Sequence, residues 1–149
     1  MFRRYIHFFA IGIVGLSILV SDCYAETYRI DAGHSSVSFS IRHIVSRIRG
    51  QFDEFSGRIV YDPEQVEKAS VEATIQTASV NTSNERRDNH LRNADFFEVD
   101  TYPTIEFKSS KVEKASENML KVSGDLTLHG ITKPVVMDVE IIGIGLHPS

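Results

Sequence analysis

Cysteine is almost absent from this chain of 149 residues, and so are most patterns that mark an enzyme or a nucleic-acid-binding protein. Cys23 is the only cysteine, so the domain is held by its core and not by disulfides. The formal net charge is −4, with the charges dispersed, which argues against nucleic acid and anionic membrane surfaces as partners. The length suits one domain, and no repeat or low-complexity linker divides it.

Catalytic and metal-binding motifs are also missing. The serines lack a G-x-S-x-G nucleophile elbow, and no glycine-rich phosphate loop is present. His34, His43, His90 and His129 form no H-x-x-x-H or H-x-H pair, and the one near pairing with a carboxylate is Asp88 with His90. A metal site assembled in space stays open; otherwise these histidines make local hydrogen bonds or lie near a cavity mouth. We expect no catalysis, no metal and no cofactor.

The first 25 residues have the composition of a secretory signal peptide. Arg3 and Arg4 form a positive start, residues 8–20 are uncharged and apolar, and Cys23-Tyr24-Ala25 offers a cleavage site. Cleavage after Ala25 would release residues 26–149 as the exported domain. An uncleaved membrane anchor remains the alternative, although the apolar run is short for a membrane span.

Residues 26–149 mostly alternate apolar and polar side chains, which is the period of a half-buried strand. The alternation predicts strands at 27–31, 36–43, 48–61, 71–77, 104–112, 119–128 and 135–141. Within 48–61 the apolar parity shifts between Phe52 and Phe55, which predicts a bulge or a bend. Short turns such as His129-Gly130 join the strands. The pattern indicates an all-β fold, an antiparallel barrel or sandwich of about six strands.

The segment 79–103, from Ser79 to Pro103, breaks this alternation. Asn81, Ser83 and Asn84 offer helix caps, a charged run follows, and Phe96-Phe97 comes next. This order predicts one short helix. The segment is either a lid against the mouth of the β-structure, with one phenylalanine turned inward, or an ordinary surface crossover anchored by one phenylalanine. The residues alone favour neither.

A series of short motifs runs through the chain in one order. They are DAGHS at 31–35, VSFSIRH at 37–43, GQFDEFSG at 50–57, DP at 62–63, SVNT at 79–82, RDNHL at 87–91, DFF at 95–97, YP at 102–103 and GDLTLHGITKPV at 124–135. In these motifs the chain resembles the YceI-like family of lipocalin-like, polyisoprenoid-binding proteins. The resemblance runs from about Thr27 to about Gly143.

The resemblance implies an eight-stranded antiparallel barrel in the periplasm, with an elongated apolar cavity for a long isoprenoid or another lipid-like chain. The family continues past its G-x-G-x-x-P region into further strands, and this sequence does not. We therefore expect about six of the eight strands and an open barrel. Because an unpaired sheet edge aggregates, the sequence predicts either a truncated reading frame or a homodimer in which a second copy completes the barrel.

Apolar residues on the alternating faces are the candidates for the cavity lining. They are Val37, Phe39, Ile41, Phe52, Ile59, Val71, Ile75, Phe96, Phe97, Ile105, Phe107, Leu126, Val135, Met137 and Val139. The alternative is that these residues fill a solid core, as in small barrels.

Arg87 and His90, with Arg86 and Arg92 nearby, are the candidates for contacting a phosphate-bearing or otherwise polar head group. The alternative is a solvated helix face on which Arg87 and Asp88 cap locally. We therefore expect a binding or carrier protein without chemistry of its own. A cofactor-free enzyme acting on a lipid in the same cavity, through His90 or Asp88, and a non-functional truncated carrier remain the alternatives.

Overall fold

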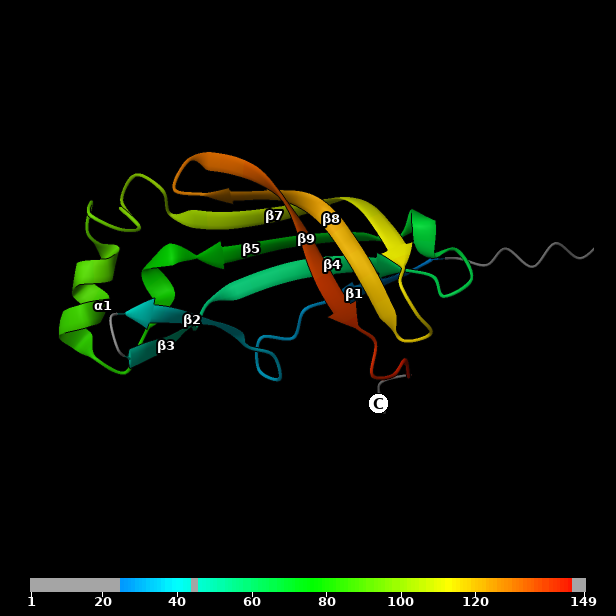
Figure 1. The fold of residues 1–149 in the computed structure, drawn as a ribbon, viewed down its shortest axis with the longest axis horizontal. Coiled ribbons are helices and arrows are strands. Elements are labelled where there is room, and N and C mark those ends of the chain that lie inside the picture. Colours follow the sequence, from blue (N-terminus) through cyan, green and yellow to red (C-terminus); the bar gives the residue numbers. More distant parts are fainter. Residues whose placement is uncertain (1–24, 44–45, 146–149) are drawn as a thin grey trace, which may run out of the picture.

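The part of the chain that the structure describes folds into antiparallel strands with a single α-helix (Figure 1). The computed structural model describes residues 25–43 and 46–145, so the predicted signal peptide, apart from Ala25, lies outside the described residues. The elements are β1 (Glu26–Arg29), β2 (Val37–His43), β3 (Ser46–Phe52), β4 (Phe55–Tyr61), the 3₁₀ turn η1 (Val66–Lys68), β5 (Ser70–Gln76), the 3₁₀ turn η2 (Thr77–Ser79), β6 (Val80–Asn81), α1 (Glu85–Arg92), β7 (Thr104–Lys114), β8 (Met119–Leu128) and β9 (Ile131–Glu140). The all-β prediction with one short helix is confirmed.

The strands form a six-stranded sheet, ordered β1-β4-β5-β7-β8-β9, and a three-stranded sheet, ordered β2-β3-β6. Backbone hydrogen bonds join the two sheets: the Asp53 amide donates to the Ser79 carbonyl at 3.1 Å, and the Gln76 amide donates to the Glu54 carbonyl at 2.9 Å. The predicted single strand 48–61 is therefore corrected to two strands, β3 and β4. The break falls where the parity shift predicted a bend.

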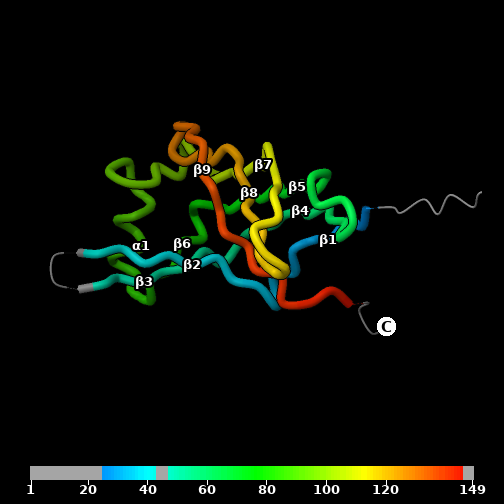
Figure 2. The backbone as a smooth tube through the Cα atoms, turned by 45° about the vertical axis from the view of Figure 1, so that its right-hand side comes forward, coloured from blue at the N-terminus to red at the C-terminus, as the bar shows by residue number. Residues whose placement is uncertain are grey.

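The nine strand segments make six long, bent strands, because β1 and β2, β3 and β4, and β5 and β6 are successive halves. The two halves of one bent strand pair with the two halves of the next bent strand. For example, β1 pairs with β4 while β2 pairs with β3. The six strands curl into a partial barrel (Figure 2). Strand β9 has no partner on its outer side among the described strands, so the expectation of an incomplete barrel is met.

The concave face of this partial barrel holds the core. One buried cluster comprises Phe107, Val112, Leu120 and Val122, and a second comprises Phe52, Val80 and Ile105. Leu126 packs against both clusters. Burial of these apolar side chains, at roughly 25 cal/mol per Å², is what holds the curled sheet together.

Gly124 in β8 is where strand and core approach most closely. A β-carbon at this position would lie 2.4 Å from the Lys108 carbonyl oxygen and 2.6 Å from the Phe107 ring. Only glycine therefore lets the Phe107 ring lie flat against β8, beside the irregularity in β7 between Ser109 and Lys111.

Candidate functional site

Two apolar hollows of about 410 Å³ each lie on the concave face. The helix-end hollow lies beside α1 and is lined by Phe39, Ile41, Phe52, Leu91, Phe96, Phe97, Ile105, Leu128 and His129. The tail-end hollow lies at the other end and is lined by Tyr28, Ile59, Tyr61, Ala69, Val71, Val112, Leu120, Val122, Val139, Glu140, Ile141, Gly143, Ile144 and Gly145. Phe107 and Leu126 lie on the same face and line neither hollow.

The predicted lining residues divide between the two hollows and the packed core. The helix-end hollow takes Phe39, Ile41, Phe52, Phe96, Phe97 and Ile105, and the tail-end hollow takes Ile59, Val71 and Val139. Val37, Ile75, Phe107, Leu126 and Val135 pack in the two clusters, and Met137 lies half exposed on β9. The inner face is thus partly hollow and partly packed, so neither interpretation made from the sequence describes all of it.

The segment 79–103 covers the end of the helix-end hollow. Phe97 turns inward and packs edge-on against Phe52, with the ring centroids 5.6 Å apart. Phe96 remains 49% exposed and contacts the His90 ring at 4.9 Å. One phenylalanine is therefore an anchor in the apolar interior, while the other lies at the rim of the hollow.

Helix α1 is fastened by its own polar side chains. Asn84 is the N-cap, and its side-chain oxygen accepts a hydrogen bond from the Arg87 amide. The Arg87 guanidinium donates to the Thr82 hydroxyl at 2.7 Å and to the Thr82 carbonyl at 2.8 Å. The Asp88 carboxylate, only 7% exposed, accepts from the Thr82 amide and hydroxyl. The geometry is that of local capping, and neither Arg87 nor His90 lines a hollow.

His129 is the polar side chain that the sequence did not single out for the site. It lines the helix-end hollow, and its ring lies 4.4 Å from that of Tyr102. Its Nε2 is buried, makes no hydrogen bond within the described chain, and lies 3.3 Å from the Glu98 carboxylate. In the sequence, His129 is one of four histidines expected to make local hydrogen bonds or to lie near a cavity mouth, and nothing separates it from the other three. Its direction depends on a left-handed backbone (φ 51°) and on the packing of the loop before β7.

The described residues contain no group of three or more His, Cys, Asp or Glu side chains placed to hold a metal ion. No helix within residues 25–43 and 46–145 is long and apolar enough to cross a membrane. Both hollows are lined mainly by apolar side chains. Their polar groups are His129, with Glu98 beside it, at the helix-end hollow and Tyr28, Tyr61 and Glu140 at the tail-end hollow.

The model of the YceI-like domain matches residues 28–147, which include both hollows and the segment that covers one of them. The chain belongs to the YceI-like family. A protein of the UPF0312 group from Vibrio cholerae is 38% identical over 142 residues, which cover 93% of this chain and 75% of that protein.

Two solved structures place the partial barrel within the same YceI-like fold. BcnA from Burkholderia cenocepacia is 28% identical with a TM-score of 0.75, over 78% of this chain and 73% of that one. The YceI protein of Campylobacter jejuni is 40% identical with a TM-score of 0.64, over 79% of this chain and 70% of that one.

Proposed function

We propose that this chain binds a long isoprenoid or comparable lipid-like chain along its concave face and carries it in the periplasm. The observation that supports this proposal is the pair of apolar hollows on one face, each of about 410 Å³. Each buried CH₂ contributes roughly 0.8 kcal/mol, so a long hydrocarbon gains affinity from contact with both hollows. Membership in the YceI-like family supports the same ligand class.

The proposal favours a carrier over an enzyme. Asp88 is engaged by Thr82 within the loop before α1, so it is not aimed at either hollow. His129 with Glu98 is an acid–base pair at the helix-end hollow, and this pair favours the alternative of a cofactor-free lipid-modifying enzyme. Turnover of a bound lipid that is lost in His129→Gln would favour the enzyme; a lipid recovered chemically intact would favour the carrier.

We include a second copy in the proposal, because the barrel is open along β9. Ile131 and Val136 on this strand are 58% and 62% exposed, and an unpaired strand edge readily pairs with another chain. A homodimer formed there would lengthen the apolar face and shield it from water.

Native mass spectrometry of protein purified from the periplasm measures the ligand, the oligomeric state and the start of the mature chain in one experiment. Protein that keeps its signal peptide, or that is recovered from the cytoplasm and not from the periplasm, would contradict the export proposal.

The substitution Phe39→Asp tests the ligand site. Phe39 lines the helix-end hollow and is only half buried, so the variant should still fold while an unpaired charge faces the lipid chain. We expect lipid content, measured by extraction and mass spectrometry, to be lost. Ser56→Asp is the control, because Ser56 is an exposed residue of β4 that lines neither hollow. Unchanged lipid content in folded Phe39→Asp would contradict the assignment. Phe107→Asp is a poorer test, because Phe107 is buried in the core.

A further inference from the structure

Lys133 in β9 is a charged side chain on the concave, apolar face of the partial barrel. It lies opposite Leu126 in the β8–β9 ladder, and Leu126 packs against both core clusters. Residues directly opposite each other in an antiparallel pair share a face of the sheet, so Lys133 extends from the side that holds the two hollows. Its side chain is exposed and makes no ion pair or hydrogen bond within the described chain. This ammonium group is therefore available to a ligand on that face.

The position of Lys133 along the sheet is between the two hollows. In the neighbouring strand β8, Leu128 lines the helix-end hollow, while Leu120 and Val122 line the tail-end hollow. Leu126, the ladder partner of Lys133, lies between them and lines neither. The cation is thus near the middle of the concave face, on the open edge strand, with an apolar hollow of about 410 Å³ on either side.

Both hollows have a carboxylate beside them. Glu98 lies 3.3 Å from His129 at the helix-end hollow, and Glu140 lines the tail-end hollow. Lys114, at the end of β7, lies on the concave face at the tail end, so an anion there would meet both a cation and the Glu140 carboxylate. Beside Lys133 an anion meets a cation alone, because no carboxylate pairs with it among the described residues. Electrostatics therefore favour the middle of the face for an anionic group.

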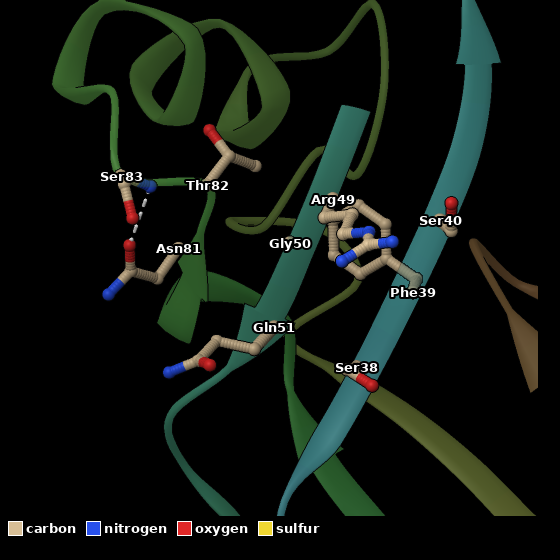
Figure 3. Close-up of a pocket in the computed structure, with 9 residues that line it drawn as sticks. All are labelled: Ser38, Phe39, Ser40, Arg49, Gly50, Gln51, Asn81, Thr82 and Ser83. Atoms are coloured by element: carbon tan, nitrogen blue, oxygen red, sulfur yellow. Dashed lines mark hydrogen bonds between the residues drawn. The ribbon is translucent and has the colours of Figure 1, made fainter. Parts of the chain in front are cut away.

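The arginines of β2 and β3 are on the other side of their sheet. Arg42, Arg47 and Arg49 alternate with the residues that line the helix-end hollow, so they face outward. Arg49 lines an outer hollow of about 610 Å³ (Figure 3). The polar groups of that hollow are engaged within the chain, as where the Asn81 amide donates to the Asp53 carboxylate at 2.8 Å. These arginines therefore do not compete with Lys133 for a ligand on the concave face.

We infer that the ligand is a lipid with one anionic head group and two hydrocarbon chains. The head group lies against Lys133 at the open edge, and one chain lies in each hollow. A lysine ammonium binds a phosphate as a point charge, and the equal volumes of the hollows suit two chains of similar size. A single chain with its anion at one end would place that anion beside Glu98 or Glu140 and leave Lys133 without a partner. This inference rests on the proposed function, in that a lipid occupies the concave face, and it names the class of that lipid.

The alternative role of Lys133 is protection of the sheet edge. An inward-pointing charge on an edge strand opposes pairing with another chain. That role predicts stronger self-association of K133Q in sedimentation velocity and an unchanged choice of lipid. Contact with a head group predicts the reverse: the choice of lipid changes.

The test measures binding of four lipids to the purified, delipidated protein by native mass spectrometry in detergent solution. Phosphatidylglycerol has two chains and a charge, lysophosphatidylglycerol lacks one chain, and diacylglycerol lacks the charge. Undecaprenyl phosphate has a single isoprenoid chain with its anion at one end. We expect phosphatidylglycerol to bind at least about tenfold more tightly than any of the other three. K133Q should bind phosphatidylglycerol about tenfold more weakly and diacylglycerol as before.

K114Q is the matched control, because it removes the same charge from an exposed lysine at the tail end of the concave face. It should bind phosphatidylglycerol as the unsubstituted protein does. Affinity lost in K114Q and kept in K133Q would overturn the inference, since the head group would then lie at one end. Neither lysine is paired, so both variants should keep the thermal midpoint of the unsubstituted protein, which excludes misfolding as the cause of lost affinity.

The comparison lipids separate this inference from the proposed function. Binding of lysophosphatidylglycerol or undecaprenyl phosphate that equals or exceeds that of phosphatidylglycerol would overturn the two-chain ligand and leave the proposed function standing. Failure of all four lipids to bind would contradict the proposed function itself.

Discussion

At the scale of single residues, polar contacts within residues 78–92 fix the start of the segment 79–103. Thr82 is the centre of this arrangement, because its amide, hydroxyl and carbonyl are all engaged by Arg87 or Asp88. Arg92 adds two bonds, to the carbonyls of Ala78 and Val80, at 2.8 and 2.9 Å. These contacts fix the start of α1 and thus the position of Phe97 over the helix-end hollow.

We predict that Asp88→Ala destabilises the domain by about 1–3 kcal/mol, because the buried Thr82 amide loses its acceptor. The free energy of unfolding in urea measures this. Asp95→Ala is the control, since Asp95 is an exposed aspartate in the same segment with no hydrogen bond or ion pair among the described residues. A midpoint for Asp88→Ala equal to that of Asp95→Ala would show that the contact with Thr82 contributes nothing to stability.

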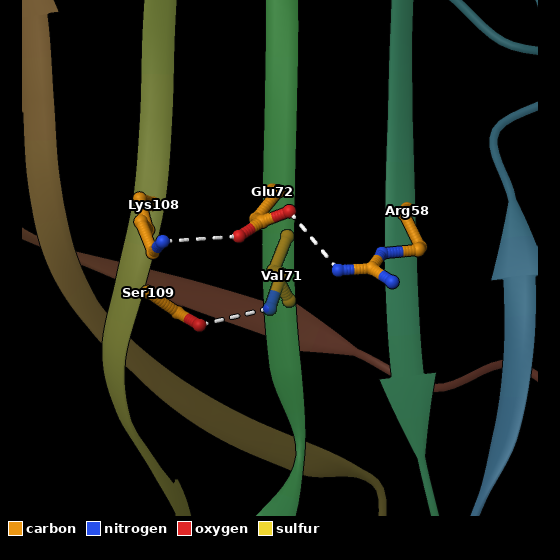
Figure 4. A network of polar contacts seen from close by, with 5 residues as sticks. All are labelled: Arg58, Val71, Glu72, Lys108 and Ser109. Carbon is orange, nitrogen blue, oxygen red and sulfur yellow. Dashed lines mark hydrogen bonds and ion pairs between the residues drawn. The ribbon is translucent and has the colours of Figure 1, made fainter.

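On the convex face, Glu72 bridges Lys108 and Arg58 at 3.3 and 3.2 Å (Figure 4). The hydrogen bonds from Lys108 and then Arg58 lower the pKa of the Glu72 carboxyl below its ordinary value. A carboxyl with a lowered pKa stabilises the fold above its unfolded-state pKa, and that contribution is lost as the pH falls through the folded-state value. We predict a small stability difference between the unsubstituted protein and Glu72→Gln that is present at neutral pH and disappears in acid. Thermal unfolding of both proteins at several pH values measures this stability difference. A difference that grows as the pH falls would contradict the prediction.

Polar site residues were the least predictable from the sequence. Arg87 and His90 lie in a charged run for which the sequence left two interpretations open, a head-group site and local capping. The Arg87 guanidinium is directed at Thr82, which is local capping. Strand register brings Arg42, Arg47 and Arg49 to one face of the β2–β3 pair, which the net charge of the chain does not show. The position of the His129 ring depends on its contact with Tyr102, which lies in the loop before β7 and is distant in the sequence.

At the scale of elements, the β8–β9 turn sets the shape of the rim at the helix-end hollow. His129 and Gly130 both have left-handed backbone conformations, with φ of 51° and 70°, as tight two-residue hairpin turns require. A β-carbon on Gly130 would also lie 2.5 Å from the Tyr102 ring. Tyr102 in turn contacts His129, so turn, rim and preceding loop are packed as one unit.

We predict that Gly130→Ala destabilises the domain by about 1–3 kcal/mol, through the strained φ and the collision with Tyr102. Gly143→Ala is the control, because a β-carbon there meets nothing within 4 Å. Chemical denaturation of both variants measures the difference. Equal stability of the two would show that the turn relaxes freely and that Tyr102 does not constrain it.

Strands were predicted well where alternation is uninterrupted. The expected strand 119–128 coincides with β8. The ends of the expected strands 71–77 and 104–112 differ from those of β5 and β7 by no more than two residues. The bend between β3 and β4 was predicted from a parity shift in the sequence. Strand β6, which pairs with β3, was not predicted, because two residues are too few to show a periodicity. Val80, fully buried in β6, therefore fell inside a segment that the pattern described only as a break.

At the scale of the whole molecule, six bent strands make a concave apolar face without closing around it. The two hollows and the packed stretch around Phe107 and Leu126 share this face. A ligand that contacts both hollows must therefore pass over Phe107 and Leu126 instead of threading an enclosed tunnel. The open edge at β9 determines whether that path is covered.

The unpaired edge of β9 makes self-association sensitive to a single charged substitution on this strand. Val136 lies on β9 opposite Ser123 of β8 and is 62% exposed, and a charge on an edge strand opposes pairing with another chain. We predict that the unsubstituted protein forms a concentration-dependent dimer in sedimentation velocity and that Val136→Lys shifts it to monomer. Ser56→Lys, at an exposed position of β4 in the interior of the sheet order, is the control with the same added positive charge away from the edge. A monomer at every concentration would mean that the lipid chain is covered by this chain alone, and the proposed second copy would then be wrong.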